Sequence, residues 1–418
     1  MEAVAQNNRR WFKLLAACAV MIAIGFIYGW SVFSTPIAAE FAWEPTTVSF
    51  TFTVLMWAFC AGGIIGPRIA NRTSLRTTLI VTAAGICAAF VLTALLVQRD
   101  TPWVMYVTYG AVGGCCVGMA YTTTMGATIP WFPDRTGLAS GLMLLCYGMS
   151  TMVLGSVAAA LFSSIGWRQS FVVLSAGIAA AIILLSFAIR KPSSEEIRSL
   201  GLLSEKAERT PRNPMDPNPA HDLNCTTADM VKRPVFYLYV SWMVSVSCIG
   251  LGLIGSANQL ALDIGTAVPV AAIVVGILSL CNGFGRLATG FVFDLVGVSA
   301  TMAIVALAHA VGCLLVLIAL SQSSLALMVV GMIVGGLGIG GTSVVGSGFT
   351  AKAFGTTHFA ENLSVLNLSL IPAALIGPLI MSSSATGAHS YSFGVMGLFA
   401  LGIIAAVLSW IMRTRWEK

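Results

Sequence analysis

The chain has 418 residues, of which 57% are hydrophobic and only 9% are charged, and its formal net charge is +6. Because soluble domains carry about 25% charged residues, this composition excludes a soluble globular protein and predicts one that crosses a membrane many times. The basic residues gather in loops and tails, so the positive charge does not indicate nucleic-acid binding. The first apolar stretch follows Arg9, Arg10 and Lys13 without a small-residue cleavage site, which predicts a first membrane span rather than a signal peptide.

Hydropathy predicts twelve apolar runs of about 20–28 residues, the length of membrane-spanning α-helices. The predicted spans are 12–39, 47–70, 76–97, 103–129, 136–163, 167–190, 235–261, 269–293, 299–320, 324–351, 359–383 and 391–412. The proline-rich polar segment 191–233 predicts an irregular linker. We therefore expect an all-α membrane protein with an N-terminal bundle over 1–190 and a C-terminal bundle over 234–418.

The distribution of basic residues predicts the orientation in the membrane. Of the 22 Lys and Arg residues, only Arg99 and Arg168 fall in loops on one side, and Arg286 lies inside a span. All the others lie on the opposite side, which the positive-inside rule identifies as cytoplasmic. We expect a multi-pass protein of the inner or plasma membrane with both termini and the linker in the cytoplasm.

The two halves resemble each other. An offset of 222 or 223 residues separates three pairs of similar positions: Asn71 and Asp294, Gly113 and Gly335, and Phe132 and Phe354. A repeated offset predicts a parallel duplication of six helices, an arrangement that places a substrate site near the membrane midplane between two moving halves.

Arg286 is the residue with the clearest chemical meaning. It is the only basic residue in the apolar run from Pro269 to Phe293. An arginine at the centre of a membrane helix costs roughly 2.5–3.5 kcal/mol, so it usually faces protein or a watery cavity. There a guanidinium can bind a carboxylate through two parallel hydrogen bonds. The alternative is an arginine that reaches the membrane surface or a backbone carbonyl.

Asn282 precedes Arg286 by one helical turn and is predicted to offer the same ligand a further polar contact. The alternative for Asn282 is a hydrogen bond to a neighbouring helix.

The sequence from Gly290 through Asp294 to Gly297 resembles the loop motif G-x-x-x-D-(R/K)-x-G-x-(R/K) of the major facilitator superfamily. In the first-half copy, Arg72 and Arg76 fit the motif, whereas Asn71 replaces the aspartate. The resemblance implies twelve transmembrane helices in two pseudosymmetric six-helix bundles. It also implies a cytoplasmic gate that uses a set of five residues: Gly290, Asp294, Gly297, Arg72 and Arg76.

A narrower resemblance is to the bacterial oxalate/formate antiporter and monocarboxylate transporter group. It rests on three stretches: Tyr28-Gly-Trp-Ser-Val-Phe, Trp131-Phe-Pro-Asp-Arg-Thr-Gly-Leu-Ala-Ser-Gly141 and Asn282-Gly-Phe-Gly-Arg286. This resemblance implies that Arg286 binds the anion and that Tyr28, Tyr121 and Tyr147 line the cavity. The alternative for the tyrosines is packing between helices.

Two departures from this group bear on the substrate. The oxalate carrier of the group has a second cation, a lysine, where this chain aligns Leu370, and larger aromatic residues where it has Ile339 and Ser343. One cation suits one carboxylate, because a second negative charge would lie poorly matched in a low-dielectric site. We therefore expect a monocarboxylate larger than oxalate.

Energy coupling is open from the sequence alone. No Asp or Glu lies well inside a predicted span, and Asp263, at the outer end of the seventh span, is the nearest coupling candidate. The alternative for Asp263 is a solvated loop residue. Proton symport and anion exchange therefore both remain possible modes.

We expect no cofactor, no metal and no enzymatic activity, because neither a nucleotide-binding loop nor a catalytic constellation is present. The expected partners are the anion, membrane lipid and, for symport, protons, and the expected assembly is a monomer. Two alternatives stay open. One is an exporter of larger amphiphilic or drug-like compounds on the same fold, favoured by the glycine-rich, uncharged tenth span. The other is a non-transporting membrane sensor that signals through the linker.

Overall fold

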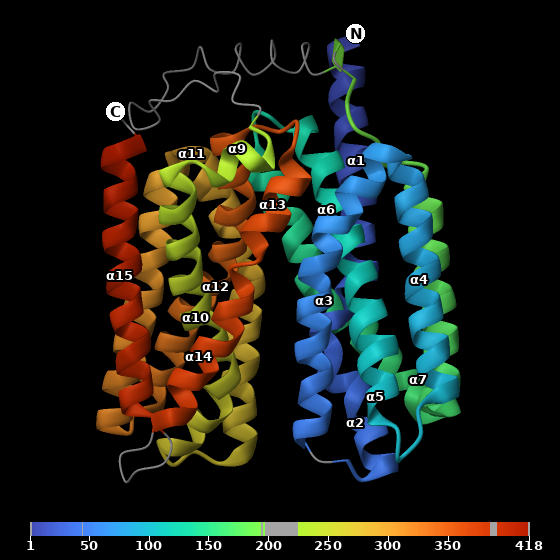
Figure 1. Cartoon of the computed structure of the whole chain (residues 1–418). Coiled ribbons are helices and arrows are strands. Elements are labelled where there is room, and N and C mark those ends of the chain that lie inside the picture. The colour runs from blue at the N-terminus through green and yellow to red at the C-terminus, as the bar shows by residue number, and fades with distance from the viewer. Residues whose placement is uncertain (1, 44, 194, 197–224, 385–390, 417–418) are drawn as a thin grey trace. The chain divides into compact units, whose positions relative to one another are not determined.

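The computed structural model describes residues 2–43, 45–193, 195–196, 225–384 and 391–416, and helices are their only regular secondary structure (Figure 1). The helices are α1 (Glu2–Ile24), η1 (Gly25–Gly29), α2 (Trp30–Phe41), α3 (Pro45–Arg72), α4 (Leu75–Leu96), α5 (Pro102–Met105), η2 (Tyr106–Gly113), α6 (Gly114–Thr128), η3 (Ile129–Trp131), α7 (Thr136–Ser186), α9 (Thr227–Val231), α10 (Pro234–Asp263), α11 (Val268–Gln322), α12 (Leu325–Phe354), α13 (Phe359–Asn367), α14 (Leu370–Ser384) and α15 (Ser392–Trp416). The predicted all-α class is confirmed.

Eleven helical stretches in the described residues are long and apolar enough to cross a membrane. One of them, Ile273–Gln322, has 50 residues, which is far longer than a bilayer core of about 30 Å requires at about 1.5 Å per residue. It contains Gly297, whose φ of 80° lies in the left-handed region and marks the junction of two helices. Divided at Gly297, the eleven stretches give twelve membrane-crossing segments, as the sequence predicts.

Two of the predicted spans contain breaks. Residues 359–383 divide into α13 and α14, because Pro372 has no amide hydrogen for the Leu368 carbonyl and its ring clashes with that carbonyl in a regular helix. The amide of Ile371 donates to the Leu368 oxygen at 3.0 Å instead. The first span is likewise divided by the short 3₁₀ segment η1.

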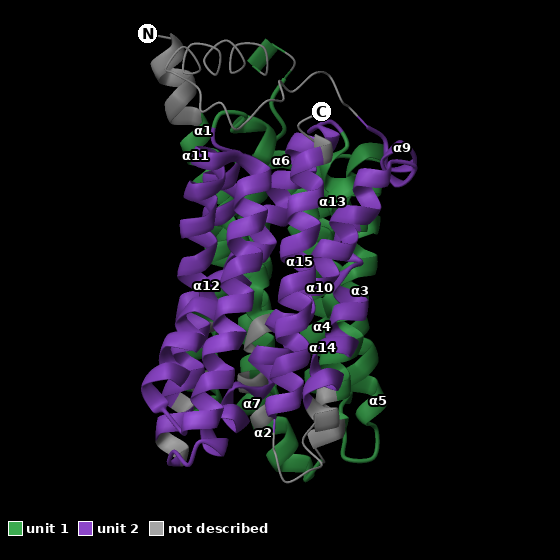
Figure 2. Cartoon of the chain, turned by 90° about the vertical axis from the view of Figure 1, so that its left-hand side faces the viewer, with its two compact units in different colours: residues 1–134, 143–207, 358–365 green, residues 135–142, 208–357, 366–418 purple. Residues whose placement is uncertain are grey.

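Contacts within the chain define two compact units (Figure 2). Unit 1 comprises residues 1–134, 143–207 and 358–365, and unit 2 comprises residues 135–142, 208–357 and 366–418. The two short segments, 135–142 and 358–365, begin 223 residues apart, which is the offset of the internal repeat. The bundle boundaries predicted at 190 and 234 remain predictions.

Unit 1 has an aromatic core. The ring centroid of Phe90 in α4 lies 5.0 Å from Phe26, 5.3 Å from Tyr109 and 5.1 Å from Phe171. These rings come from η1, η2 and α7, so one cluster ties four segments together. Edge-to-face and tilted pairs at these distances add stabilisation beyond burial of area.

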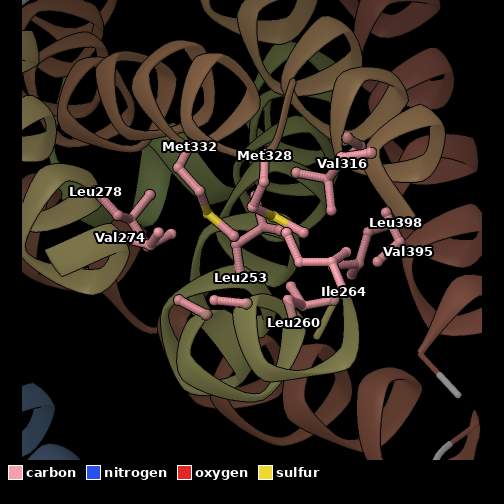
Figure 3. Packing of buried hydrophobic residues seen from close by; sticks show 14 of the residues in the cluster. Leu253, Leu260, Ile264, Val274, Leu278, Val316, Met328, Met332, Val395 and Leu398 are labelled. Carbon is pink, nitrogen blue, oxygen red and sulfur yellow. The ribbon is translucent and has the colours of Figure 1, made fainter. Parts of the chain in front are cut away.

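Unit 2 has an aliphatic and methionine core (Figure 3). Leu253 and Leu260 of α10 meet Met328 and Met332 of α12, and Leu398 of α15 belongs to the same buried cluster. Because lipid is as apolar as these side chains, their packing contacts rather than exclusion of water hold the helices together.

The internal repeat is visible in how closely the helices approach. A Cβ atom added to Gly118 of α6 would lie 2.0 Å from the carbonyl oxygen of Phe59, and one added to Gly340 of α12 would lie 2.2 Å from that of Asn282. Two further pairs repeat this way: Gly114 to Leu55 with Gly336 to Leu278, and Gly62 to Cys115 with Gly285 to Leu337. Corresponding residues are 222 or 223 positions apart, so both units use the same glycine-mediated helix pair.

Candidate functional site

Arg286 lies inside the apolar part of α11, thirteen residues after Ile273 and eleven before the junction at Gly297. Only 7% of its surface is exposed. A guanidinium enclosed at this depth is costly unless its charge and hydrogen-bond donors are matched by protein or ligand. Burial of this kind favours an interior position over the alternative in which the side chain reaches the membrane surface.

Two glycines hold the backbone of Arg286 in place. A Cβ atom on Gly340 of α12 would lie 2.7 Å from the Arg286 amide nitrogen. A Cβ atom on Gly141, at the start of α7, would lie 2.8 Å from the Arg286 carbonyl oxygen. Real Cβ atoms do not come this close to backbone, so both positions require glycine, and the arginine is fixed between two helices.

Asn282 is one turn before Arg286 on α11 and is partly buried. Its Oδ1 atom is buried and accepts no hydrogen bond within the part of the chain that the structure describes. A buried acceptor without a donor costs about 1–3 kcal/mol, so this oxygen is a favourable position for a donor brought by another group.

The structure brings together two of the three predicted cavity tyrosines in unit 1. The rings of Tyr121 in α6 and Tyr147 in α7 have centroids 5.3 Å apart, and Phe59 of α3 lies 5.4 Å from Tyr121. Both tyrosines are buried. The side chain of Tyr28 lies outside the described residues. The contact between Tyr121 and Tyr147 is compatible with a cavity wall and with packing between helices.

The second-half gate motif contacts the start of α7. The Asp294 carboxylate accepts hydrogen bonds from the backbone amides of Gly137 at 2.8 Å and Leu138 at 2.7 Å. Beside it, a Cβ atom on Gly290 would lie 2.4 Å from the Gly137 oxygen. An acidic side chain there satisfies amides that have no partner in the helix and opposes the positive end of the helix dipole.

We expect Asp294→Ala to lower the free energy of unfolding by about 1–3 kcal/mol, because two buried amides lose a charged acceptor. Thermal unfolding of the purified protein measures this loss. Asp263→Ala is the matched control, since Asp263 is exposed at the end of α10. Equal melting temperatures for Asp294→Ala and Asp263→Ala would contradict the assigned contact.

The first-half copy of the motif makes a different contact in unit 1. Asn71 donates from Nδ2 to Oε1 of Glu361 at 3.0 Å, and its Oδ1 accepts from Lys191 at 3.3 Å. The guanidinium carbon of Arg76 lies 4.4 Å from the centre of the Phe187 ring, and Arg72 is exposed. An amide-to-carboxylate bond here thus stands where the second half uses a carboxylate and backbone amides.

Sequence reasoning missed Gly137 and Gly141 as partners of α11. They appeared only as letters of the signature that begins at Trp131. Their spacing of four residues is the small-residue pattern that allows close helix contact, and this signal is present in the sequence.

The first residues of that signature organise one end of unit 1. Arg10 donates to Asp134 at 2.7 Å. The Trp131 ring lies between Lys13, 4.8 Å from its centre, and Arg190, 5.0 Å away. Trp131 also donates from its indole nitrogen to the Arg190 carbonyl oxygen at 2.8 Å. The stretch therefore has a structural role in addition to marking a family.

Arg190 also holds the beginning of the linker. It donates two hydrogen bonds to Glu196, at 2.7 and 2.6 Å. These bonds to the guanidinium, more than any other interaction, lower the pKa of Glu196 to about 2. The pair therefore remains ionised at physiological pH.

The coupling candidate Asp263 is the last residue of α10 and is exposed. Its role in coupling remains a prediction. No group of three or more His, Cys, Asp or Glu residues in the described part of the chain is placed to hold a metal ion.

These features define a polytopic α-helical membrane protein with an internally repeated architecture and one buried cation in a membrane-spanning helix. Residues 15–259 match the sequence profile of the Major Facilitator Superfamily. Because this match covers more than half of the chain, the protein belongs to that superfamily of transporters and is not an enzyme.

Two curated relatives match about 70% of the chain. An uncharacterised MFS-type transporter of Escherichia coli, YhjX, is 22% identical over 289 residues, covering 69% of this chain and 67% of the relative. The oxalate:formate antiporter of Oxalobacter formigenes is 25% identical over 299 residues, covering 71% of this chain and 66% of the antiporter. The matched regions span about two thirds of these relatives.

A mammalian carrier matches a shorter region. Monocarboxylate transporter 2 of Rattus norvegicus is 26% identical over 168 residues, which is 39% of this chain and 33% of that protein. The narrower resemblance predicted from the sequence is thus confirmed at the level of relatives.

A solved structure shows the same fold. The proton:xylose symporter XylE, bound to 6-bromo-6-deoxy-D-glucose, aligns with a TM-score of 0.72 and 14% identity. The alignment covers 98% of this chain and 96% of XylE. At this identity the likeness concerns the fold alone.

Proposed function

We propose that this protein is a secondary active transporter that moves a small organic anion, specifically a monocarboxylate, across the membrane by alternating access. The observation that carries this proposal is the buried guanidinium of Arg286, the only basic side chain in its predicted span. In this proposal Arg286 grips the carboxylate and Asn282 supplies a further polar contact.

The relatives support a carboxylate substrate. The antiporter and the monocarboxylate transporter carry names that specify oxalate, formate or monocarboxylates. The present chain has Leu370 at the position aligned with the oxalate carrier's second cation. One intramembrane cation therefore favours one negative charge on the substrate.

The tenth span contributes less free space than its glycine content suggests. Ile339 packs against the hydrophobic core of unit 2, and Ser343 donates to the Gly340 oxygen at 3.1 Å. Gly336 and Gly340 are filled by close contact with α11, and Gly338 by His309. This packing weakens the alternative of an exporter for larger amphiphiles, and it assigns any extra room for substrate to the position of Ser343.

The proposal places both termini and the linker in the cytoplasm and the protein in the inner or plasma membrane. It rests on the excess of Lys and Arg in the loops on that side. Cysteine labelling from either side, with single cysteines introduced at Asp100 and Arg413, tests this orientation, because the two positions should react from opposite sides.

Purified protein in proteoliposomes tests the substrate class. We expect a thermal-shift screen of about thirty carboxylates to select monocarboxylates, and uptake of the best labelled compound to be blocked by other monocarboxylates but not by dicarboxylates. Uptake driven by an imposed pH gradient indicates symport, and uptake that requires preloaded substrate indicates exchange. Uptake of neutral amphiphiles without any carboxylate uptake would contradict the proposal.

For the tyrosines, we expect Tyr121→Phe and Tyr147→Phe each to raise the apparent KM by about threefold to tenfold, the loss of one hydrogen bond to a substrate. Initial rates in proteoliposomes measure this change. Tyr109→Phe is the matched control, since Tyr109 is fully buried in the aromatic core of unit 1. Unchanged kinetics for both Tyr121 and Tyr147 variants would assign these rings to packing.

A further inference from the structure

Helix α1 and the start of α7 lie against each other in unit 1 at two separate points. Arg10 donates to Asp134 at 2.7 Å, two residues before α7 begins at Thr136. Just past the end of α1, a Cβ atom on Gly25 would lie 2.2 Å from the Tyr147 oxygen and 2.5 Å from the Ser150 Cβ. Because the residue numbers rise together from one contact to the next, the two helices run parallel as neighbours.

Two cysteines lie between these contacts. Cys18 precedes Gly25 by seven residues, which is about two helical turns, and Cys146 precedes Ser150 by four, which is about one turn. This spacing places each cysteine on the face that its helix turns toward the other. The two side chains hydrogen-bond to each other, and neither cysteine is in a disulfide.

Their surroundings differ from those of the other cysteines. Cys18 and Cys146 are both partly exposed, whereas Cys60 and Cys313 are buried. Cys87 is also partly exposed, but its sulfur pairs with the Ser175 hydroxyl at 3.7 Å. Partial exposure gives a small oxidant access, and a second thiol in contact allows the first oxidation product to be trapped.

We propose that Cys18 and Cys146 form a redox-active dithiol that a hydroperoxide converts into a disulfide between α1 and α7. In the first step one thiol sulfur attacks a peroxide oxygen, and the O–O bond breaks to give a sulfenic acid and one water. In the second step the other thiol attacks that sulfur and releases a second water. With hydrogen peroxide, two thiols lose two hydrogens and two electrons, and one peroxide becomes two waters.

The geometry required is close to the one present. A disulfide needs sulfur atoms about 2.05 Å apart and Cα atoms about 4.4–6.8 Å apart. Thiols that already hydrogen-bond on facing helices reach this arrangement through side-chain rotation. The product would tie α1 to α7 between the Arg10 contact and the Gly25 contact, and a dithiol reductant would reverse it.

The test uses the purified full-length protein and hydrogen peroxide. After oxidation, unfolding and alkylation, we expect two of the ten cysteines to escape the alkylating reagent, and mass spectrometry to find one linked peptide pair joining Cys18 to Cys146. Dithiothreitol should restore both thiols. A non-reducing gel should show a monomer, because the bond is within one chain.

Matched variants separate this site from general oxidation. Cys146→Ser should abolish the linked pair, and Cys87→Ser should retain it. Three results would overturn the proposal: all ten thiols still alkylated at a peroxide dose that oxidises free cysteine, oxidation that ends as sulfinic acid without a linked pair, or links that join other cysteines. The wild-type measurement decides the question even where a variant folds poorly.

Discussion

Replacement of Arg286 by glutamine is expected to lower anion uptake at least 100-fold. Glutamine keeps polar atoms but removes the charge, so a bound carboxylate would sit in a low-dielectric site without its counter-ion. Breaking a buried ion pair by removing one partner costs about 3–5 kcal/mol, and about 1.4 kcal/mol corresponds to a factor of ten. Initial uptake rates and equilibrium binding in proteoliposomes measure the loss.

Arg286→Lys separates charge from geometry. Lysine keeps the positive charge but has no planar pair of donors for a carboxylate, and its shorter reach alters the contact. We expect a smaller loss of binding than with glutamine, with uptake still well below the wild-type rate. A carboxylate held only by charge would instead bind equally well to Arg286→Lys and to wild type.

Arg76→Gln is the matched control for the loss of one arginine. Its guanidinium lies over the exposed ring of Phe187, outside the span that contains Arg286. Uptake by Arg76→Gln should therefore stay within a few-fold of wild type. If Arg286→Gln and Arg286→Lys both accumulate substrate like wild type while retaining the wild-type melting temperature, Arg286 is not the anion-binding residue.

The sequence was sufficient to predict the class of fold. Twelve apolar runs separated by short polar loops leave few arrangements in lipid, because every backbone amide in the bilayer must find a partner within a helix. The duplication was also visible, since Asn71 and Asp294 keep the same offset that the helix contacts of Gly118 and Gly340 later repeat. Arg286 stood out for a related reason, as a charge that lipid does not tolerate.

Local helix geometry was harder to predict. Hydropathy reports only how apolar a stretch is, so it treated residues 359–383 as one span although Pro372 interrupts it. The signal existed, because proline in a helix interior removes a hydrogen bond. Its consequence depends on whether neighbouring groups satisfy the freed carbonyl, and this information is tertiary. The amide of Ile371 does so here.

The partners of the gate motif also required the structure. The motif identified Asp294, but nothing in its letters indicated that the acceptor would meet the amides of Gly137 and Leu138. In the first half, replacement of the aspartate by Asn71 appeared to remove the contact. The structure shows that Glu361, about 290 residues away along the chain, supplies the missing carboxylate. Sequence spacing cannot reveal such long-range pairs.

The second large effect is expected at Gly340. A Cβ atom there would lie 2.2 Å from the Asn282 oxygen and 2.7 Å from the Arg286 nitrogen, so Gly340→Ala must push α12 and α11 apart. Overpacking in a well-packed interior costs about 1–3 kcal/mol. We expect a melting temperature lower by several degrees, together with a loss of uptake larger than the loss of folded protein, because the displaced backbone is the one that carries Arg286.

Gly335→Ala is the matched control on the same helix. Its added Cβ would meet only the Cδ1 atom of Leu253, at 3.4 Å, which is an ordinary contact. Alanine also favours the helix over glycine by about 1 kcal/mol. We therefore expect wild-type stability and uptake from Gly335→Ala. If Gly340→Ala melts and transports like Gly335→Ala, then α11 and α12 are not held together as the glycines indicate, and the fixed placement of the arginine backbone has no support.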